Sequence, residues 1–102
     1  PDGQQVVTAC EDGTAKLWDA SSGECLHTLQ GHGDFVGSAA FSPDGQRLVT
    51  ASSDTTAKLW DAASGECLRT FQGHEFAVLS AFFSPDGQQV LTASQDTTAK
   101  LW

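Results

Sequence analysis

Short apolar segments alternate with polar turns along the whole chain. The segments are rich in β-branched and apolar residues, and the stretches between them hold Gly, Pro, Asp and Ser, which favour turns. Short, evenly spaced segments of this kind indicate β-strands, and no helical period accompanies them. The sequence therefore predicts an all-β chain whose ten strands lie near residues 4–10, 14–19, 24–29, 35–41, 46–52, 56–61, 66–71, 77–83, 88–94 and 98–102.

One stretch, Asp-Thr-Thr-Ala-Lys-Leu-Trp-Asp at residues 54–61, sets the organisation of the chain. A near copy lies 42 residues earlier at 12–19, and another lies 42 residues later at 96–102. A fixed period of this length is typical of repeat architectures. In each copy, turn residues lead into a short alternating segment, so we expect a turn followed by a strand that ends in Trp.

The differences between the copies show which positions of the repeat can vary. Residues 19–60 and 61–102 are identical at 30 of 42 positions. Several differences fall together at 33–35 and 37 against 75–77 and 79, and Ser53 is replaced by Gln95. A repeat that packs against copies of itself keeps its packing surfaces constant. The variable positions are therefore expected on an exposed face.

The constant positions form a recognisable pattern. Gly31-His32 opens a unit that closes with Trp60-Asp61, and Ser-Pro-Asp-Gly and Ser-Ser-Asp segments lie between at 42–45 and 52–54; residues 73–102 repeat the pattern. This closely resembles WD40 repeats over the whole chain. The resemblance implies a partial β-propeller, built of four-stranded antiparallel blades around a central channel.

In that family, each unit supplies the outermost strand of one blade and three strands of the next. The resemblance thus implies an incomplete blade without its innermost strand at 1–30, a complete blade at 31–72 and a blade without its outermost strand at 73–102. Because the chain begins inside a turn motif and lacks Met, we expect an excerpt of a longer protein. Neighbouring blades, from the parent chain or from an assembly, would complete the ring. Bare blade faces are expected to expose Leu17, Leu59 and Phe83.

Each unit contains a hydroxyl, a His and an Asp, the groups of a nucleophilic triad. A structural role explains them better. The indole N–H of a buried Trp60 needs an acceptor, which a strand hydroxyl offers. His32 can accept from that hydroxyl, and Asp54 can accept from the other ring nitrogen. The set recurs with every repeat, whereas an active site is normally built once, and the WD40 resemblance implies the same tetrad. We therefore expect a protein that is not an enzyme.

Thr50 is the favoured hydroxyl of this tetrad. Its equivalents keep a hydroxyl in every copy, whereas Ser52 is replaced by Cys10 in the first. The expected structural tetrads are His32, Thr50, Asp54 and Trp60, then His74, Thr92, Asp96 and Trp102, with Thr8, Asp12 and Trp18 in the first copy.

The net charge limits the possible binding partners, and the cysteines indicate the cellular compartment. Five basic and 13 acidic residues give a net charge of −8, so the chain lacks the basic surface that nucleic acid or an anionic membrane requires. Three cysteines at 10, 25 and 67 form no paired spacing. They are expected to be buried free thiols in a reducing compartment, which places the protein in the cytoplasm. No metal-ligand spacing is present, and no cofactor is expected.

Two functions remain open. The first is a non-catalytic interaction scaffold, part of a larger propeller that binds protein or peptide partners on its top face through variable positions. The candidate residues are Asp34, Phe35, Gly37, Ser53, Phe76, Ala77, Leu79 and Gln95. Phe35, Phe76 and Leu79 are candidate apolar anchors, unless the Phe rings pack between blades.

The second function is a sensor or regulatory region of a multidomain signalling protein, such as a kinase or a nucleotide-switch ATPase. Its catalytic part would then lie outside these residues. A Walker A or kinase motif in the flanking sequence would decide for this alternative.

Overall fold

The computed structural model describes residues 5–9 and 12–102, and this part of the chain contains strands and turns but no helix. The ten strands expected from the sequence are present within the described residues, and the all-β class is confirmed. Residues 4 and 10, where the first strand was expected to begin and end, lie outside the description. The strands are β1 Gln5–Ala9, β2 Ala15–Asp19, β3 Cys25–Leu29, β4 Val36–Phe41, β5 Arg47–Ser52, β6 Ala57–Asp61, β7 Cys67–Phe71, β8 Val78–Phe83, β9 Val90–Ser94 and β10 Ala99–Leu101.

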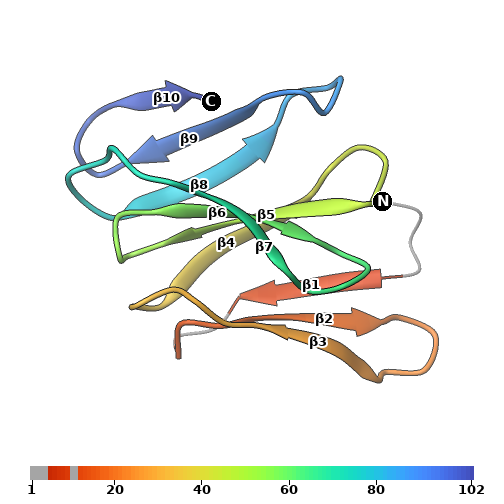
Figure 1. The fold of residues 1–102 in the computed structure, drawn as a ribbon. Coiled ribbons are helices and arrows are strands. Elements are labelled where there is room, and N and C mark those ends of the chain that lie inside the picture. The colour runs from red at the N-terminus through yellow and green to blue at the C-terminus, as the bar shows by residue number, and fades with distance from the viewer. Residues whose placement is uncertain (1–4, 10–11) are drawn as a thin grey trace.

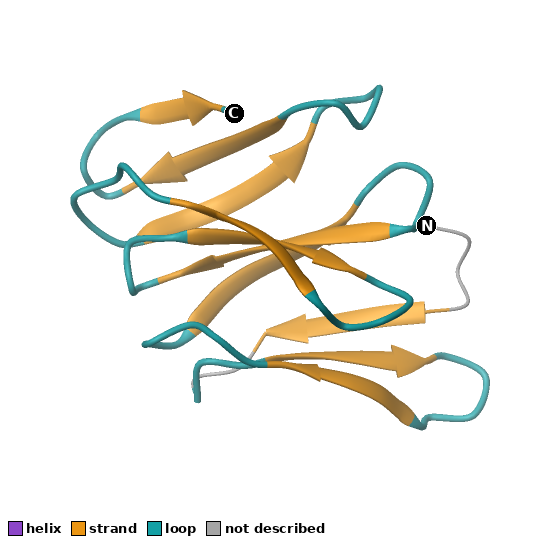
Figure 2. Ribbon diagram, in the orientation of Figure 1, coloured by secondary structure: helices purple, strands orange, loops and turns teal. Residues whose placement is uncertain are grey.

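Three antiparallel sheets stack beside one another (Figures 1 and 2). In each sheet the strands follow chain order, namely β1-β2-β3, then β4-β5-β6-β7, then β8-β9-β10. The middle sheet has the four strands expected of a complete blade. The interpretation of the outer two sheets as blades without an innermost or outermost strand stays a prediction.

Two apolar layers hold the sheets together. Successive strand residues point to opposite faces, so the middle sheet contributes to both layers. Leu48 and Trp60 face the first sheet, and Val49 and Ala51 face the third. The first layer contains Ala15, Leu17, Leu29, Leu48, Trp60 and Ala62. The second contains Val49, Ala51, Ala57, Phe71, Val78, Ala81 and Val90. Burial on both faces explains why β5 is an almost continuous run of buried residues.

The outer face of the third sheet carries an exposed apolar ladder. Phe82 pairs with Leu91, and Leu91 pairs with Leu101, so the three side chains share one face. Their exposed fractions are 55%, 46% and 61%. We call this set the outer ladder.

The expectation that Leu17, Leu59 and Phe83 would be exposed is wrong. Leu17 is fully buried in the first layer, and Leu59 and Phe83 pack against the second. All three point inward because they lie on the faces that meet the neighbouring sheet. The outer ladder takes the exposed position instead.

The cysteines also differ from expectation. Cys25 and Cys67 are free thiols, but both are exposed because they begin β3 and β7 at the sheet edge. Cys10 lies outside the described residues. The expected burial is therefore wrong, and the reducing-compartment argument loses its basis. None of the described residues belongs to a helix long and apolar enough to cross a membrane.

A β-bulge interrupts the pairing of the first strand in both the middle and the third sheet. The pairing of β4 with β5 shifts between Val36 and Ser38, and that of β8 with β9 shifts between Val78 and Ser80. The bulged residues are Gly37 and Leu79. A bulge leaves its residue unpaired and redirects the side chain. This redirection explains why Leu79 is half exposed although it belongs to a strand.

We expect residues 1–102, produced alone, to self-associate through the outer ladder. Apolar surface left in water costs about 25 cal/mol per Å², and the ladder offers three large side chains. Sedimentation velocity at micromolar concentration should show oligomers that Leu91→Lys weakens. Leu68→Lys serves as the control, because Leu68 is equally exposed, at 48%, but lies on β7. A folded monomer with a cooperative melt would contradict this expectation.

Candidate functional site

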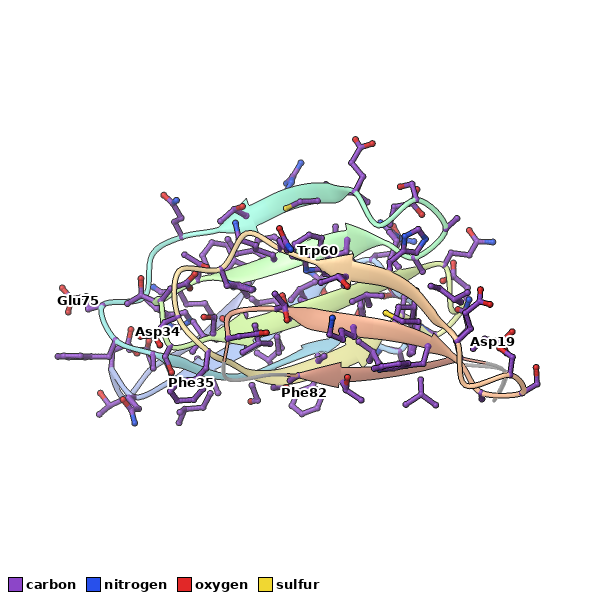
Figure 3. All side chains as sticks on the ribbon, turned by 90° about the horizontal axis from the view of Figure 1, so that it is seen from below. Asp19, Asp34, Phe35, Trp60, Glu75 and Phe82 are labelled. Atoms are coloured by element: carbon purple, nitrogen blue, oxygen red, sulfur yellow. The ribbon has the colours of Figure 1, made fainter. Side chains whose placement is uncertain are left out.

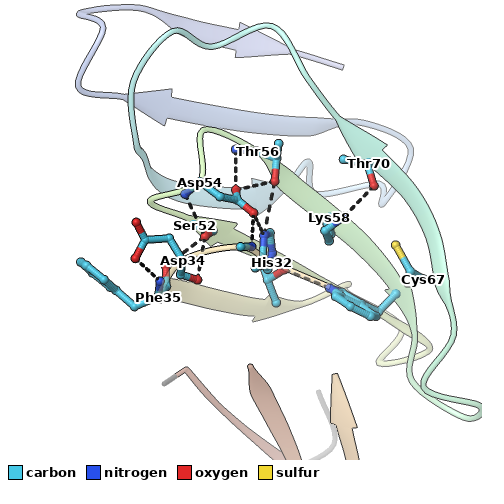
Figure 4. Close-up of polar contacts among 12 residues, drawn as sticks. His32, Asp34, Phe35, Ser52, Asp54, Thr56, Lys58, Cys67 and Thr70 are labelled. Carbon is cyan, nitrogen blue, oxygen red and sulfur yellow. Dashed lines mark hydrogen bonds and ion pairs between the residues drawn. The ribbon is translucent and has the colours of Figure 1, made fainter. Parts of the chain in front are cut away.

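A chain of hydrogen bonds runs through the middle sheet (Figure 4). The indole Nε1 of Trp60 donates to Thr50 Oγ1 at 2.9 Å, and Thr50 Oγ1 lies 2.6 Å from His32 Nε2. His32 Nδ1 lies 2.9 Å from Asp54 Oδ2. Trp60 pairs with Leu48, so Thr50 is its diagonal neighbour across the strands and within reach of the large ring. The structure thus brings together the four residues expected from the sequence.

These bonds fix the protonation of His32. Thr50 Oγ1 accepts from the indole, and its single proton can then go only to His32 Nε2. His32 Nε2 is therefore the bare nitrogen, and Nδ1–H donates to Asp54. Burial of the ring lowers the pKa of His32 below its ordinary value of 6.5, although the Asp54 carboxylate opposes this shift. The ring is therefore neutral at neutral pH.

Asp54 ties the loop before β4 to the turn between β5 and β6. Its Oδ2 accepts the backbone N–H of Gly33 at 2.9 Å, and its Oδ1 accepts the N–H and hydroxyl of Thr56. Burial raises the pKa of Asp54, but these donors together with His32 outweigh it and lower the pKa to about 2. The carboxylate is therefore charged and fully engaged at neutral pH.

The third sheet repeats the arrangement. Trp102 Nε1 donates to Thr92 Oγ1 at 2.9 Å, Thr92 Oγ1 lies 2.7 Å from His74 Nε2, and His74 Nδ1 lies 2.9 Å from Asp96 Oδ2. Hydrogen bonding by Thr98, then by His74 and the Glu75 N–H, holds the pKa of Asp96 well below its usual range.

In the first sheet, Trp18 Nε1 donates to Thr8 Oγ1 at 3.0 Å, and Asp12 Oδ1 accepts the N–H of Thr14 at 3.0 Å. Thr8 is exposed, whereas Thr50 and Thr92 are fully buried. The first copy thus keeps its indole bond in a more solvated setting. The stabilising role of all three sets stays a prediction.

Sequence reasoning missed a second anchor of the loops. Ser52 Oγ donates to the carbonyl oxygens of Asp34 at 3.2 Å and Phe35 at 3.0 Å, and Ser94 makes the same bonds to Phe76 and Ala77. The recurrence of Ser at this position was the available signal. The first copy has Cys10 at this position, which obscures that signal.

The anchored loops enclose a groove of about 650 Å³ between the middle and third sheets. Seven of the eight expected partner-binding residues line it, and Thr55, Glu75 and Val78 complete the lining; the seven are Phe35, Gly37, Ser53, Phe76, Ala77, Leu79 and Gln95. Asp34 is not among the lining residues but directly precedes Phe35. We call this feature the top-face groove, after the face on which the sequence predicts partner binding. The exposed fractions of Phe35, Phe76 and Leu79 are 45%, 58% and 53%, so about half of each side chain is open to solvent.

One residue at the groove has an unusual backbone. Thr55 has φ of +79°, a conformation that costs a residue other than glycine about 1–3 kcal/mol. The equivalent residue of the first copy is Gly13, where an added Cβ would lie 2.9 Å from the carbonyl oxygen of His32. Glycine is thus required at position 13 by close approach of the neighbouring loop, whereas the groove leaves room for the Thr55 side chain.

The hydroxyl–His–Asp sets offer no accessible nucleophile. Thr50 and Thr92 have no exposed surface, and each oxygen is bonded to both an indole and an imidazole. Within 5–9 and 12–102, no group of three or more His, Cys, Asp or Glu residues is arranged to hold a metal ion. The geometry supports loop positioning rather than chemistry.

Comparison with protein families gives a match over nearly the whole chain. The model described as WD40, "WD domain, G-beta repeat", matches residues 1–19, 23–61 and 65–102. The chain belongs to the WD40 repeat family. The stacked antiparallel sheets agree with partial propeller blades.

Similar proteins are known in several organisms. Human WD repeat-containing protein 86 is 53% identical over 36 residues, which are 35% of this chain and 10% of the relative. Nuclear distribution protein PAC1 of Mycosarcoma maydis is 51% identical over 41 residues, 40% of this chain and 9% of the relative. Dynein assembly factor with WD repeat domains 1 of Danio rerio is 48% identical over 40 residues, 39% of this chain and 10% of the relative. The matches span about a tenth of each relative.

We expect Asp54→Ala to destabilise the fold without abolishing any enzymatic activity. The substitution leaves His32 Nδ1–H and the Gly33 N–H without their acceptor, at a cost of about 1–3 kcal/mol. Urea unfolding measures the loss. Asp34→Ala is the control and should change stability by less than about 0.5 kcal/mol, because Asp34 is exposed and its carboxylate accepts the N–H of the adjacent Phe35. Equal midpoints for the two variants would argue against a structural role for Asp54.

Stability should fall on acidification. The folded pKa values of Asp54 and His32 lie below the ordinary 3.8 and 6.5, so the unfolded chain binds more protons in both ranges. The His32 contribution is complete above pH 6.5 and lost below it. The contribution of Asp54 to the free energy of unfolding is complete above pH 3.8 and is lost as the pH falls toward 2. It amounts to about 1–2 kcal/mol after allowance for partial solvent exposure. When the free energy of unfolding is measured across this pH range, the decrease between pH 3.8 and pH 2 should be absent in Asp54→Ala. A stability that rises as the pH falls would contradict the assignment.

Proposed function

We propose that this chain is part of a non-catalytic interaction scaffold that binds a protein or peptide partner in the top-face groove. The single observation that carries the proposal is the convergence of variable positions. Of the twelve positions at which residues 19–60 and 61–102 differ, a group lines one groove, namely 35, 37 and 53 in the first copy and 75–77, 79 and 95 in the second. Three of these side chains are large, apolar and exposed. Constant residues serve packing, whereas variable residues on loops held by a rigid scaffold suit recognition.

The anchoring of the loops supports this proposal. His32, Asp54 and Ser52 hold the loop before β4 at several backbone atoms, so its backbone has little freedom to lose on binding. Binding to a preorganised surface avoids part of the ordering cost. The scaffold role is also typical of WD40 repeat proteins.

The wider setting follows from the relatives. Two of them are named as a nuclear distribution protein and a dynein assembly factor, which supports an intracellular and cytoplasmic location for this chain. Neighbouring WD40 blades are proposed to cover the outer ladder, because the equivalent faces of the other two sheets pack against the next sheet. The net charge of −8 argues against nucleic acid and anionic membrane as partners. The names of these relatives offer no support for a kinase or ATPase sensor, and we do not propose one.

Site-specific photo-crosslinking tests the proposal. A benzophenone amino acid at position 76, inside the groove, should yield discrete protein adducts in cells. The same group at position 68 is the control, because Leu68 is a similarly exposed apolar residue away from the groove. Adducts from position 76 should disappear when Gly37→Leu fills the groove. The same adducts from both positions, or adducts that survive Gly37→Leu, would contradict the proposal.

A further inference from the structure

We propose that the top-face groove selects a protein segment that presents a large apolar side chain with Lys or Arg beside it. This inference rests on the proposed function, because it specifies the partner of the same groove. It is carried by an apolar floor, by acidic side chains without a countercharge, and by a sequence feature common to both loops.

The floor of the groove is apolar and has free space. Phe35, Phe76 and Leu79 expose about half of their surface there. The bulge in β8 directs Leu79 out of the sheet, whereas the equivalent bulged residue in β4 is Gly37. A Cβ added at Gly37 would meet no atom within 4 Å. The asymmetry between Gly37 and Leu79 therefore leaves a space that an apolar side chain of a partner can fill.

The rim of the groove is acidic. Glu75 lines the groove, and Asp34 precedes Phe35; Figure 3 shows these three residues at one end of the molecule, opposite Asp19. The ion pairs among the described residues join His32 to Asp54 and His74 to Asp96, and none of them involves Lys or Arg. The carboxylates of Glu75 and Asp34 thus have no basic partner in the described part of the chain.

None of the five basic side chains lines the groove, and that of Lys100 lies beside Gly73. Lys16 and Lys58 donate to hydroxyls on the neighbouring strands β3 and β7. Arg47 and Arg69 line a different cavity together with Leu68. Because no Lys or Arg of the described residues lines the groove or forms an ion pair with Glu75 or Asp34, a partner cation can interact with these carboxylates without displacing an internal one. Complementary charge raises association rates and specificity.

The two loops carry the same dipeptide in different repeat positions. An acid directly precedes Phe in Asp34-Phe35 and again in Glu75-Phe76. Counted in the 42-residue period, the second pair is shifted by one residue, since Phe76 is the equivalent of Asp34. The individual positions differ, yet the acid and the ring remain together in both loops. A partner segment with a basic residue next to an apolar residue would complement this pair of an acid and an aromatic ring.

Fluorescence anisotropy with three short labelled peptides tests the inference. Each peptide has a Gly/Ser frame and a central Leu-Phe flanked by Lys, by Ser or by Glu. The Lys peptide should bind about tenfold more tightly than the Glu peptide at low salt. The Ser peptide should fall between them, and added salt should reduce the difference by screening.

Variants separate charge from shape. Glu75→Gln with Asp34→Asn should reduce the affinity of the Lys peptide to that of the Ser peptide and leave the Ser peptide unchanged. Gly37→Leu, which introduces the residue found at position 79, should abolish binding of both while the circular dichroism stays that of the parent. Leu68→Ser is the control and should have no effect.

Three negative outcomes can be told apart. If the Glu peptide binds as tightly as the Lys peptide and the charge variants have no effect, the basic partner is excluded while the groove remains a binding site. If Lys-peptide binding survives Gly37→Leu, the groove itself is wrong and the proposed function fails with it. If no peptide binds, the inference is overturned, and the crosslinks from position 76 decide whether the groove has another partner.

Discussion

The structure depends on the hydrogen bond between a buried indole N–H and its acceptor. Trp60 fills the layer between the first two sheets, and its ring is almost fully enclosed. An indole nitrogen left without an acceptor in that setting would cost about 1–3 kcal/mol. Thr50 accepts the bond and donates onward, so His32 and Asp54 are drawn into one chain of donors and acceptors that crosses the sheet to the top face. Among the described residues, no buried side-chain nitrogen or oxygen lacks a hydrogen-bond partner.

This constraint links packing to recognition. The same Asp54 that completes the chain also holds the Gly33 N–H, and Ser52 holds the next two carbonyl groups. Buried polar atoms therefore determine where Asp34 and Phe35 stand, although neither of these two residues takes part in the core. The residues of the chain of bonds can stay constant while the residues at the groove change. Such a division lets one scaffold present different surfaces in successive repeats.

Much of this arrangement was predictable from sequence because it depends on local patterns. The strands are predicted by the alternation of apolar and polar residues and by the turn residues between them. The tetrad is predicted by matching the indole donor of Trp60 to the hydrogen-bond acceptors within one repeat. The exposed ladder was not predictable, since Phe82 and Phe83 are adjacent Phe residues and only the stacking of sheets decides which one faces water. The prediction that Cys25 is buried was wrong for a related reason, because residue type does not reveal the start of an edge strand. The role of Ser52 depends on the path of the loop above it.

The most direct test of this account is the ¹⁵N NMR spectrum of the His32 ring at neutral pH. The hydrogen-bond chain requires a neutral ring with the proton on Nδ1 and a bare Nε2, together with slow exchange of the Trp60 indole N–H. Observation of both would support the chain from Trp60 to Asp54. A proton on Nε2, a charged ring at neutral pH, or an indole N–H that exchanges as fast as that of free tryptophan would contradict it.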